Sequence, residues 1–359
     1  MATRITKENF HKIWKLIVVR VTDAFTTPPV VFKIGGSTVG TLGNFSASTG
    51  KGKSKKTFNV CAIVAAALSG KTVLNYEPSF PEDKRRVLYF DTEQSSYHCH
   101  KVLERINKLV GYPPDYDCDR IDFVMLREYS PIERRQIIEL ALDERPGVGL
   151  VVIDGLRDLL FDINSSSEAA EVIGLLMRWT SLYNIHIHTV LHLNKGDDNV
   201  RGHIGTELNH KAETILQICV NDNDSTISEV HPAMVRDKDF VPFAFRINDG
   251  GLPEIVDGVD MTHKPKISSF DYENMTEELH RQALDVAFGT DDENPESPPL
   301  SYSPLLKRLA VGYKSLGYSR GRNAQVNLLK FLLSKGIISC FDRNYVYNRD
   351  FHYVPPCDR

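Results

Sequence analysis

The chain lacks most of the features by which secreted, zinc-binding and membrane proteins are recognised. Six cysteines are spread over 359 residues and none forms a C-x-x-C pair, so neither a disulfide framework nor a cysteine-ligated zinc site is expected. No run approaches the roughly 18 apolar residues of a membrane span, and the first residues lack the apolar core of a signal peptide. These absences predict a protein of the reducing cytoplasm that has no membrane partner.

Charge is distributed unevenly along the chain. The whole chain has a formal net charge of −4, but residues 299–359 carry ten basic and three acidic side chains. Just before this basic tail, residues 289–299 are acidic, rich in proline and free of apolar side chains, as is typical of an exposed linker. The length allows two domains. We therefore expect an N-terminal helical segment (1–30), with an amphipathic helix from Asn9 to Asp23, a large core (31–265), a linker region (266–298) and a C-terminal domain (299–359).

The segment Gly50–Thr57, with the sequence GKGKSKKT, is the most informative part of the chain. It lies between an extended run, Asn44–Thr49, and an apolar helical run, Phe58–Leu68. In a strand–loop–helix arrangement, backbone N–H groups and the helix N-terminus form an anion site for phosphates. A lysine then contacts the β- and γ-phosphates, and a hydroxyl group binds Mg²⁺. The segment therefore predicts a phosphate-binding loop.

Two frames of the motif G-x-x-x-x-G-K-[ST] fit this region, and a basic, solvated turn is the simpler alternative. The first frame is Gly50–Thr57, with Lys55 at the second glycine position; the second is Ala47–Ser54, with alanine at the first. We favour the first because the apolar helix begins directly after it. The second would place Lys55 and Lys56 beside the positive end of the helix dipole. The expected ATP-binding residues are Gly50, Lys51, Gly52, Lys53, Ser54, Lys55, Lys56, Thr57 and Phe58.

Three later apolar runs each end in polar residues. The runs are Arg86–Phe90, Gly149–Ile153 and Ile185–Leu191, and their continuity favours strands buried on both faces of a parallel sheet. Helical patterns separate them, which predicts repeated βαβ units with ligands at the carboxyl edge of the sheet. The strand ends supply, in chain order, Asp91 and Glu93, Asp154, and His192. Each could instead be a strand-end cap, a turn residue or a core histidine.

These ordered motifs resemble the RecA-like P-loop ATPases over roughly residues 40–248. The resemblance is strongest to the branch with the RepA-type plasmid replicative helicase and related ATPases of mobile genetic elements. It implies an α/β fold with a largely parallel, twisted sheet, and ATP and Mg²⁺ as cofactors. The chain departs from the family at Lys55, where the loop needs the conformational freedom of glycine.

The resemblance also assigns roles to individual residues. It makes Lys56 the phosphate lysine, Thr57 and Asp154 the Mg²⁺ ligands, Glu93 the base that orients water, and His192 the γ-phosphate sensor. Arg236, which precedes a strand-like run at Pro242–Ile247, resembles an arginine finger that reaches a neighbour's ATP, although a surface turn explains it nearly as well. A finger of this kind implies a homo-oligomer, in this family a hexamer.

Two regions are candidates for DNA contact. The loops 155–167 and 194–205 correspond to loops that grip single-stranded DNA in RecA-like proteins, and they offer Arg157, Lys195 and Arg201. Residues 299–359 read as two helices followed by two short strands and look similar to a small winged-helix domain, with Arg320 and Arg322 at the second helix. A winged helix that makes only protein contacts is the alternative.

We therefore expect a DNA-dependent ATPase that moves along single-stranded DNA and also contacts duplex DNA. The preferred function is a hexameric replicative helicase, or an accessory ATPase, of a mobile genetic element. One alternative is a recombination or maintenance ATPase that does not unwind DNA. The other is a DNA-binding regulator that uses nucleotide as a switch.

Overall fold

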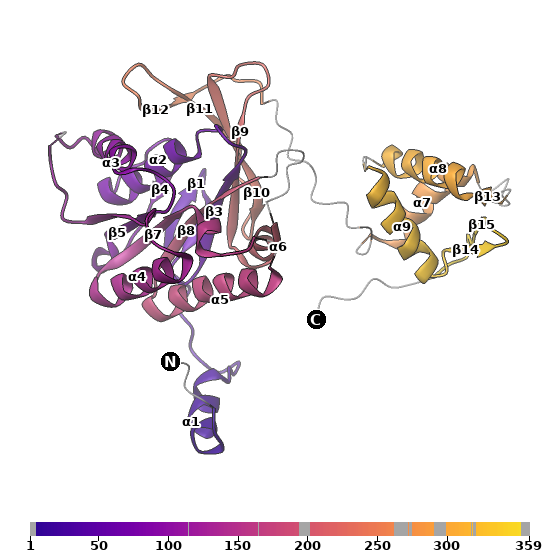
Figure 1. Cartoon of the computed structure of the whole chain (residues 1–359), viewed down its shortest axis with the longest axis horizontal. Helices are drawn as coiled ribbons and strands as arrows, with labels where there is room; N and C mark the ends of the chain where they lie inside the picture. The colour runs from indigo at the N-terminus through magenta and orange to yellow at the C-terminus, as the bar shows by residue number, and fades with distance from the viewer. Residues whose placement is uncertain are drawn as a thin grey trace. The chain divides into compact units, whose positions relative to one another are not determined.

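The computed structural model describes residues 5–113, 115–163, 165–193, 202–261, 272, 275–290, 299–316, 318 and 321–352. The chain divides into two compact units, residues 1–265 and 266–359 (Figure 1). Two apolar clusters stabilise the first unit and a third stabilises the second. Each unit therefore has a hydrophobic core of its own.

The first unit is built on a nine-stranded mixed sheet. Its spatial order is β12-β11-β10-β9-β3-β8-β7-β5-β6. From β9 to β6 the neighbouring strands are parallel, and from β9 to β12 they are antiparallel. The strands are β3 (Phe45–Gly50), β5 (Arg86–Asp91), β6 (Ile121–Met125), β7 (Val148–Asp154), β8 (His186–His192), β9 (Thr214–Val220), β10 (Ile227–Val235), β11 (Phe243–Ile247) and β12 (Pro253–Val256).

Helices cover both faces of this sheet (Figure 1). The helices α2 (Lys56–Ser69) and α3 (Ser96–Val110) pack on one face, and α4 (Pro131–Glu144), α5 (Ser166–Tyr183) and α6 (Gly202–Lys211) pack on the other. Along β7, Val152 belongs to the first core and Ile153 to the second, because successive strand residues point to opposite faces. The expected α/β fold with a mostly parallel sheet is thus confirmed.

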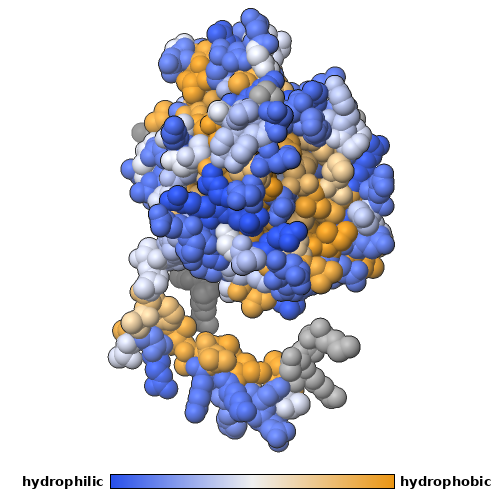
Figure 2. All heavy atoms as spheres, turned by 90° about the vertical axis from the view of Figure 1, so that its left-hand side faces the viewer, coloured by the Kyte–Doolittle hydropathy of each residue, from blue (hydrophilic) through white to orange (hydrophobic). Residues whose placement is uncertain are grey.

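A smaller sheet and an exposed helix complete the first unit. The small sheet consists of β2 (Ser37–Thr41), β1 (Val30–Ile34) and β4 (Glu77–Pro78), and its apolar residues join the core on the α2 side. Short 3₁₀ turns are η1 (Glu82–Lys84) and η2 (Leu156–Leu159). The N-terminal helix α1 spans Lys7–Ile17 and buries none of its residues. It ends earlier than the predicted helix, and its apolar side chains form an exposed stripe (Figure 2).

The described residues of the second unit form three helices and a three-stranded sheet. Its elements are α7 (Glu277–Phe288), β13 (Leu300–Ser301), α8 (Tyr302–Ser315), α9 (Arg322–Ser334), β14 (Ile338–Phe341) and β15 (Asn344–Tyr347), with the strand order β13-β15-β14. The interpretation of residues 266–298 as a linker is wrong over α7. The side chain of Thr276 caps this helix, and Ala283, Leu284 and Phe288 are buried in the core of the unit. The acidic, proline-rich stretch follows α7 and does not include it.

Candidate active site

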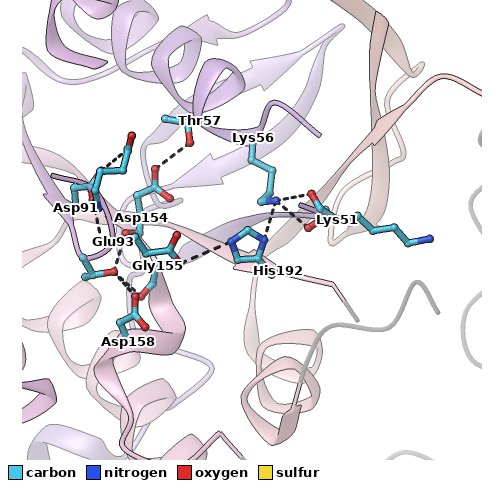
Figure 3. A network of polar contacts seen from close by, with 12 residues as sticks. Lys51, Lys56, Thr57, Asp91, Glu93, Asp154, Gly155, Asp158 and His192 are labelled. Atoms are coloured by element: carbon cyan, nitrogen blue, oxygen red, sulfur yellow. Dashed lines mark hydrogen bonds and ion pairs between the residues drawn. The ribbon is translucent and has the colours of Figure 1, made fainter. Parts of the chain in front are cut away.

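The loop between β3 and α2 lies at the carboxyl edge of the parallel strands. β3 ends at Gly50 and α2 begins at Lys56, so Lys56 and Thr57 occupy the first turn of the helix (Figure 3). A Cβ atom at Gly50 would lie 2.3 Å from the carbonyl oxygen of Ile218 and 2.5 Å from Oγ of Ser54. Only glycine fits this position, so the loop leaves the sheet with its backbone close to β9.

The loop contains two lysines in the left-handed region. Lys53 has φ 67° and Lys55 has φ 64°, a conformation that costs a residue with a Cβ roughly 1–2 kcal/mol. Nζ of Lys55 donates to the carbonyl oxygens of Thr226 at 2.6 Å and Ser225 at 3.3 Å. Lys55 therefore adopts the backbone conformation that glycine would provide, while its side chain contacts the turn between β9 and β10.

The amine of Lys56 lies inside the loop. Its Nζ donates to the carbonyl oxygens of Gly50 and Lys51, each at 2.9 Å, and lies 3.2 Å from Nδ1 of His192. Burial lowers the pKa of Lys56 to about 8, against the attraction of Asp154 and Glu93. This buried cation is aimed at the space that a phosphate would occupy above a helix N-terminus.

Asp154 ends β7 opposite the first turn of α2. Its Oδ2 accepts hydrogen bonds from the hydroxyl of Tyr89 at 2.8 Å and of Thr57 at 3.5 Å. Burial raises the pKa of Asp154 to about 6, and the neighbouring carboxylate of Asp91 adds to the effect. A bound divalent cation would favour the ionised form, so this carboxylate and the hydroxyl of Thr57 suit a metal that accompanies phosphate.

The donor set fits Mg²⁺ carried by a nucleotide better than a permanently bound metal. Among the described residues, no group of three or more His, Cys, Asp or Glu side chains is placed to hold a metal ion. Mg²⁺ in phosphate sites is commonly bound by one or two protein ligands, with phosphate oxygens and water completing its shell. The buried hydroxyl of Ser54 also has no hydrogen-bond partner within the part of the chain that the structure describes, which leaves a donor for a ligand.

His192 connects the lysine to a carboxylate. Its Nε2 lies 3.7 Å from Oε1 of Glu93, while its Nδ1 faces Lys56. A lysine ammonium can only donate, so Nδ1 of His192 is the acceptor in this contact. The interaction with His192 is the main cause that lowers the pKa of Glu93. Glu93 is half exposed at the cavity, where an ionised carboxylate could orient water.

A second set of contacts fixes the ends of β5 and β7. Asp91 is buried and accepts hydrogen bonds from the backbone N–H groups of Glu93 and Gln94, so it shapes the chain that presents Glu93. The hydroxyl of Thr92 donates to Oδ2 of Asp158 at 2.8 Å. Neither Thr92 nor Asp158 was predicted as a site residue, although both lie within five residues of a predicted strand end.

The cavity extends from the phosphate loop to α3. It has a volume of about 300 Å³ and, besides the residues above, includes His98, Lys101 and Arg105 of α3. The guanidinium of Arg105 lies 3.9 Å from the ring centroid of Phe58, a cation–π contact. Sequence reasoning missed these three residues. Their spacing along α3 was the available signal, since positions three or four apart share a helix face.

The other predicted residues lie apart from this cavity or outside the described residues. Arg236 follows β10 and donates to the carbonyl oxygen of Lys211 at 3.4 Å, and it does not line the cavity. Arg157 is exposed in η2, and Arg322 is exposed at the start of α9. Lys195, Arg201 and Arg320 lie outside the described residues.

The other two histidines of β8 belong to the core. His186 and His188 are buried and hydrogen-bonded to Ser46 at 2.7 and 2.8 Å, and His188 also contacts Ser48 at 2.8 Å. Burial lowers the pKa of His188 to about 3, so this histidine is neutral. The core alternative therefore applies to these two residues, whereas His192 borders the cavity.

The comparison with protein families agrees with a nucleotide-binding core. A family described as "AAA domain" matches residues 18–198, about half of the chain. Among solved structures, the crystal structure of the RadB recombinase is similar with a TM-score of 0.42 and 15% identity, over 58% of this chain and 90% of that chain. No curated protein matches the chain.

Proposed function

The chain belongs to the AAA domain family, and from that premise we propose that it is a DNA-dependent ATPase that works as a ring-shaped oligomer. One observation carries the enzymatic part: Lys56, Asp154 and Glu93 come from three separate elements and line one cavity. This is the set that phosphoryl transfer to water requires, since catalysis there consists of positioning and charge neutralisation.

Each residue has a distinct role in this proposal. Lys56 and the N-terminus of α2 bind the β- and γ-phosphates. Thr57 and Asp154 hold Mg²⁺, which neutralises phosphate charge when bound. Glu93 accepts a hydrogen bond from the attacking water and orients it. His192 contacts both Lys56 and Glu93. A γ-phosphate bound at Lys56 therefore changes the position of the carboxylate of Glu93 through the imidazole.

The DNA-binding part of the proposal rests on the second unit and on η2. The order of α7, β13, α8, α9 and the β14–β15 hairpin is similar to a winged helix, a module that often places a helix in the major groove. We propose that α9 is this helix and that Arg322 contacts DNA. The basic balance of residues 299–359 suits phosphate contacts. In the first unit, Arg157 is an exposed cation three residues after Asp154.

The preferred biological role is a hexameric replicative helicase, or an accessory ATPase, of a mobile genetic element. Support for this finer role comes from the resemblance of the ordered motifs to the RepA-type branch. A recombination or maintenance ATPase is equally consistent with the fold. A regulator that binds nucleotide without rapid turnover is the third candidate.

Two assays separate these candidates. ATP turnover measured with and without single-stranded DNA should rise with DNA for the first two, and unchanged low turnover would favour the regulator. Unwinding of a forked duplex with ATP should occur only for the helicase. Native mass measured with ATP and DNA tests the ring, and a monomer under all conditions would contradict it.

A further inference from the structure

The phosphate loop has a lysine, Lys55, whose amine contacts the turn between β9 and β10. Lys55 occupies the position where the motif has glycine, and its Nζ donates to the carbonyl oxygens of Thr226 and Ser225. Its own carbonyl oxygen accepts the first hydrogen bonds of α2, from Phe58 at 3.1 Å and Asn59 at 3.2 Å. Lys55 therefore joins the start of this helix to the β9–β10 turn.

The turn that receives Lys55 is itself ordered by side chains. Oδ1 of Asp224 accepts hydrogen bonds from the backbone N–H of Thr226 at 2.8 Å and from its hydroxyl at 2.7 Å. Oδ1 of Asn221 accepts from the backbone N–H of Asp224 at 3.0 Å, and its Nδ2 donates to the buried Glu229 at 2.6 Å. The two acceptor carbonyls are thus presented in a fixed orientation.

The backbone conformation of Lys55 indicates that the side-chain contact matters. Glycine would adopt φ 64° without the cost that a Cβ brings. Lysine at this position has the conformational cost of a positive φ. In return, its side chain links α2 to the β9–β10 turn, which is far away in the sequence. Asp224 also attracts the Lys55 ammonium, although partial burial lowers the pKa of Lys55 overall.

We propose that Lys55 is a positioning residue that ties the phosphate loop to the β9–β10 turn and so holds the N-terminus of α2 ready for the triphosphate. The inference rests on the proposed function, because it concerns the same loop. It revises the expectation that Lys55 contacts nucleotide directly. A loop ordered in advance loses less conformational entropy when the ligand binds.

Substitutions at Lys55 separate the anchor from the backbone strain. Binding of a fluorescent, non-hydrolysable ATP analogue with Mg²⁺ would be measured together with KM and kcat. Lys55→Met keeps the stem and removes the donors, so Kd and KM should rise about tenfold while kcat stays within about threefold. Lys55→Arg keeps the donors and should restore both constants to within about threefold. Lys71→Met, at an exposed lysine beyond the other end of α2, is the matched control and should match wild type.

Lys55→Gly tests the opposite expectation. Glycine relieves the strain and restores the usual motif, but it removes the anchor. We expect weaker binding than wild type despite this relief. Equal or tighter binding by Lys55→Gly would overturn the proposal.

A double-mutant cycle tests the path through the turn. Asp224→Ala removes an exposed side chain and should raise Kd in the wild-type background but not in Lys55→Met, because the anchor is already lost there. Additive effects of Asp224→Ala and Lys55→Met on Kd would contradict the proposal. Circular dichroism spectra check that each variant is folded. If wild type and Lys55→Met bind the analogue equally well, the proposal for Lys55 is wrong but the proposed function stands. If wild type binds no nucleotide, the proposed function is wrong too.

Discussion

The amine of Lys56 lies 3.2 Å from Nδ1 of His192, which places the end of β8 against the first turn of α2. The same imidazole faces Glu93 with its other nitrogen. Lys56 is also held by two carbonyl oxygens of its own loop. A bound phosphate would compete for this amine, so nucleotide binding should alter the contacts between Lys56, His192 and Glu93.

The frame of the phosphate loop can be tested with two lysines. Lys56→Ala should reduce ATP turnover by at least about 100-fold, because the buried cation that faces the phosphates is lost. Lys53→Ala should retain most of the turnover, since in the Gly50–Thr57 frame the phosphate lysine is Lys56 and not Lys53. Steady-state ATPase assays on both proteins decide the matter. Loss of turnover in Lys53→Ala alone would mean that the Ala47–Ser54 frame is correct.

Metal binding and water activation should separate between two carboxylates. Asp154→Ala should weaken Mg²⁺-dependent ATP binding, because the metal loses a protein ligand. Glu93→Gln should still bind ATP but turn it over roughly 100-fold more slowly, as expected for loss of a base. Mg²⁺ titrations of binding, compared with single-turnover rates, distinguish the two effects. Wild-type rates in Glu93→Gln would remove this residue from the catalytic set.

The rate should depend on pH with two limbs. In the free protein, kcat/KM should rise with pH through about 6 as Asp154 ionises, because the carboxylate form holds the metal. It should fall as the pH rises through about 8, because Lys56 loses the proton that makes it a cation. Bound ATP and Mg²⁺ favour both charged forms, so the profile of kcat should be broader. A profile of kcat/KM that is flat from pH 5 to 9 would contradict both assignments.

Removal of His192 should affect Glu93 in a defined direction. The imidazole is the main cause that keeps the pKa of Glu93 low, so His192→Ala should raise that pKa. The acidic limb of the single-turnover rate should then move to higher pH, since protonated Glu93 cannot orient water. His192→Gln, which can still donate a hydrogen bond, should move it less. An acidic limb that stays in place in both variants would show that Glu93 acts without the histidine.

The position of α7 changes where the chain should be cut. A protein ending at residue 298 keeps α7 but loses the helices that cover Ala283, Leu284 and Phe288, and it should expose this apolar face and aggregate.

A protein ending at residue 265 should stay folded and retain basal ATP turnover. Its DNA affinity should be weaker and less sensitive to salt, because phosphate contacts are removed. The DNA affinity of this truncated protein, measured over a series of salt concentrations together with its native mass, tests the expectation. An unchanged affinity and salt slope would make the second unit a protein-contact module.

Much of the first unit follows from local pattern alone. The extended run before Gly50 and the apolar runs before Asp91, Asp154 and His192 form β3, β5, β7 and β8 in the parallel part of the large sheet. Continuous apolar runs fit this arrangement because both faces of these strands are covered by helices. Helix α7 was not predicted because the acidic, proline-rich residues that follow it are typical of a linker, and the whole of residues 266–298 was assigned to one. The exposed face of α3 was missed because no local pattern says which side of a helix borders a cavity.

The sequence by itself determined the phosphate loop, the helix after it and the polar residues at the strand ends, because strand, loop and helix signals are encoded over a few neighbouring residues. The tertiary structure alone decided which histidine of β8 borders the cavity, since alternation puts His186, His188 and His192 on one face and only position along the strand separates them. It also decided the partner of Lys55, whose acceptors Ser225 and Thr226 lie 170 residues or more along the chain. Contacts at that separation depend on the pairing of β9 with β3 and of β10 with β9, and no local sequence pattern encodes that pairing.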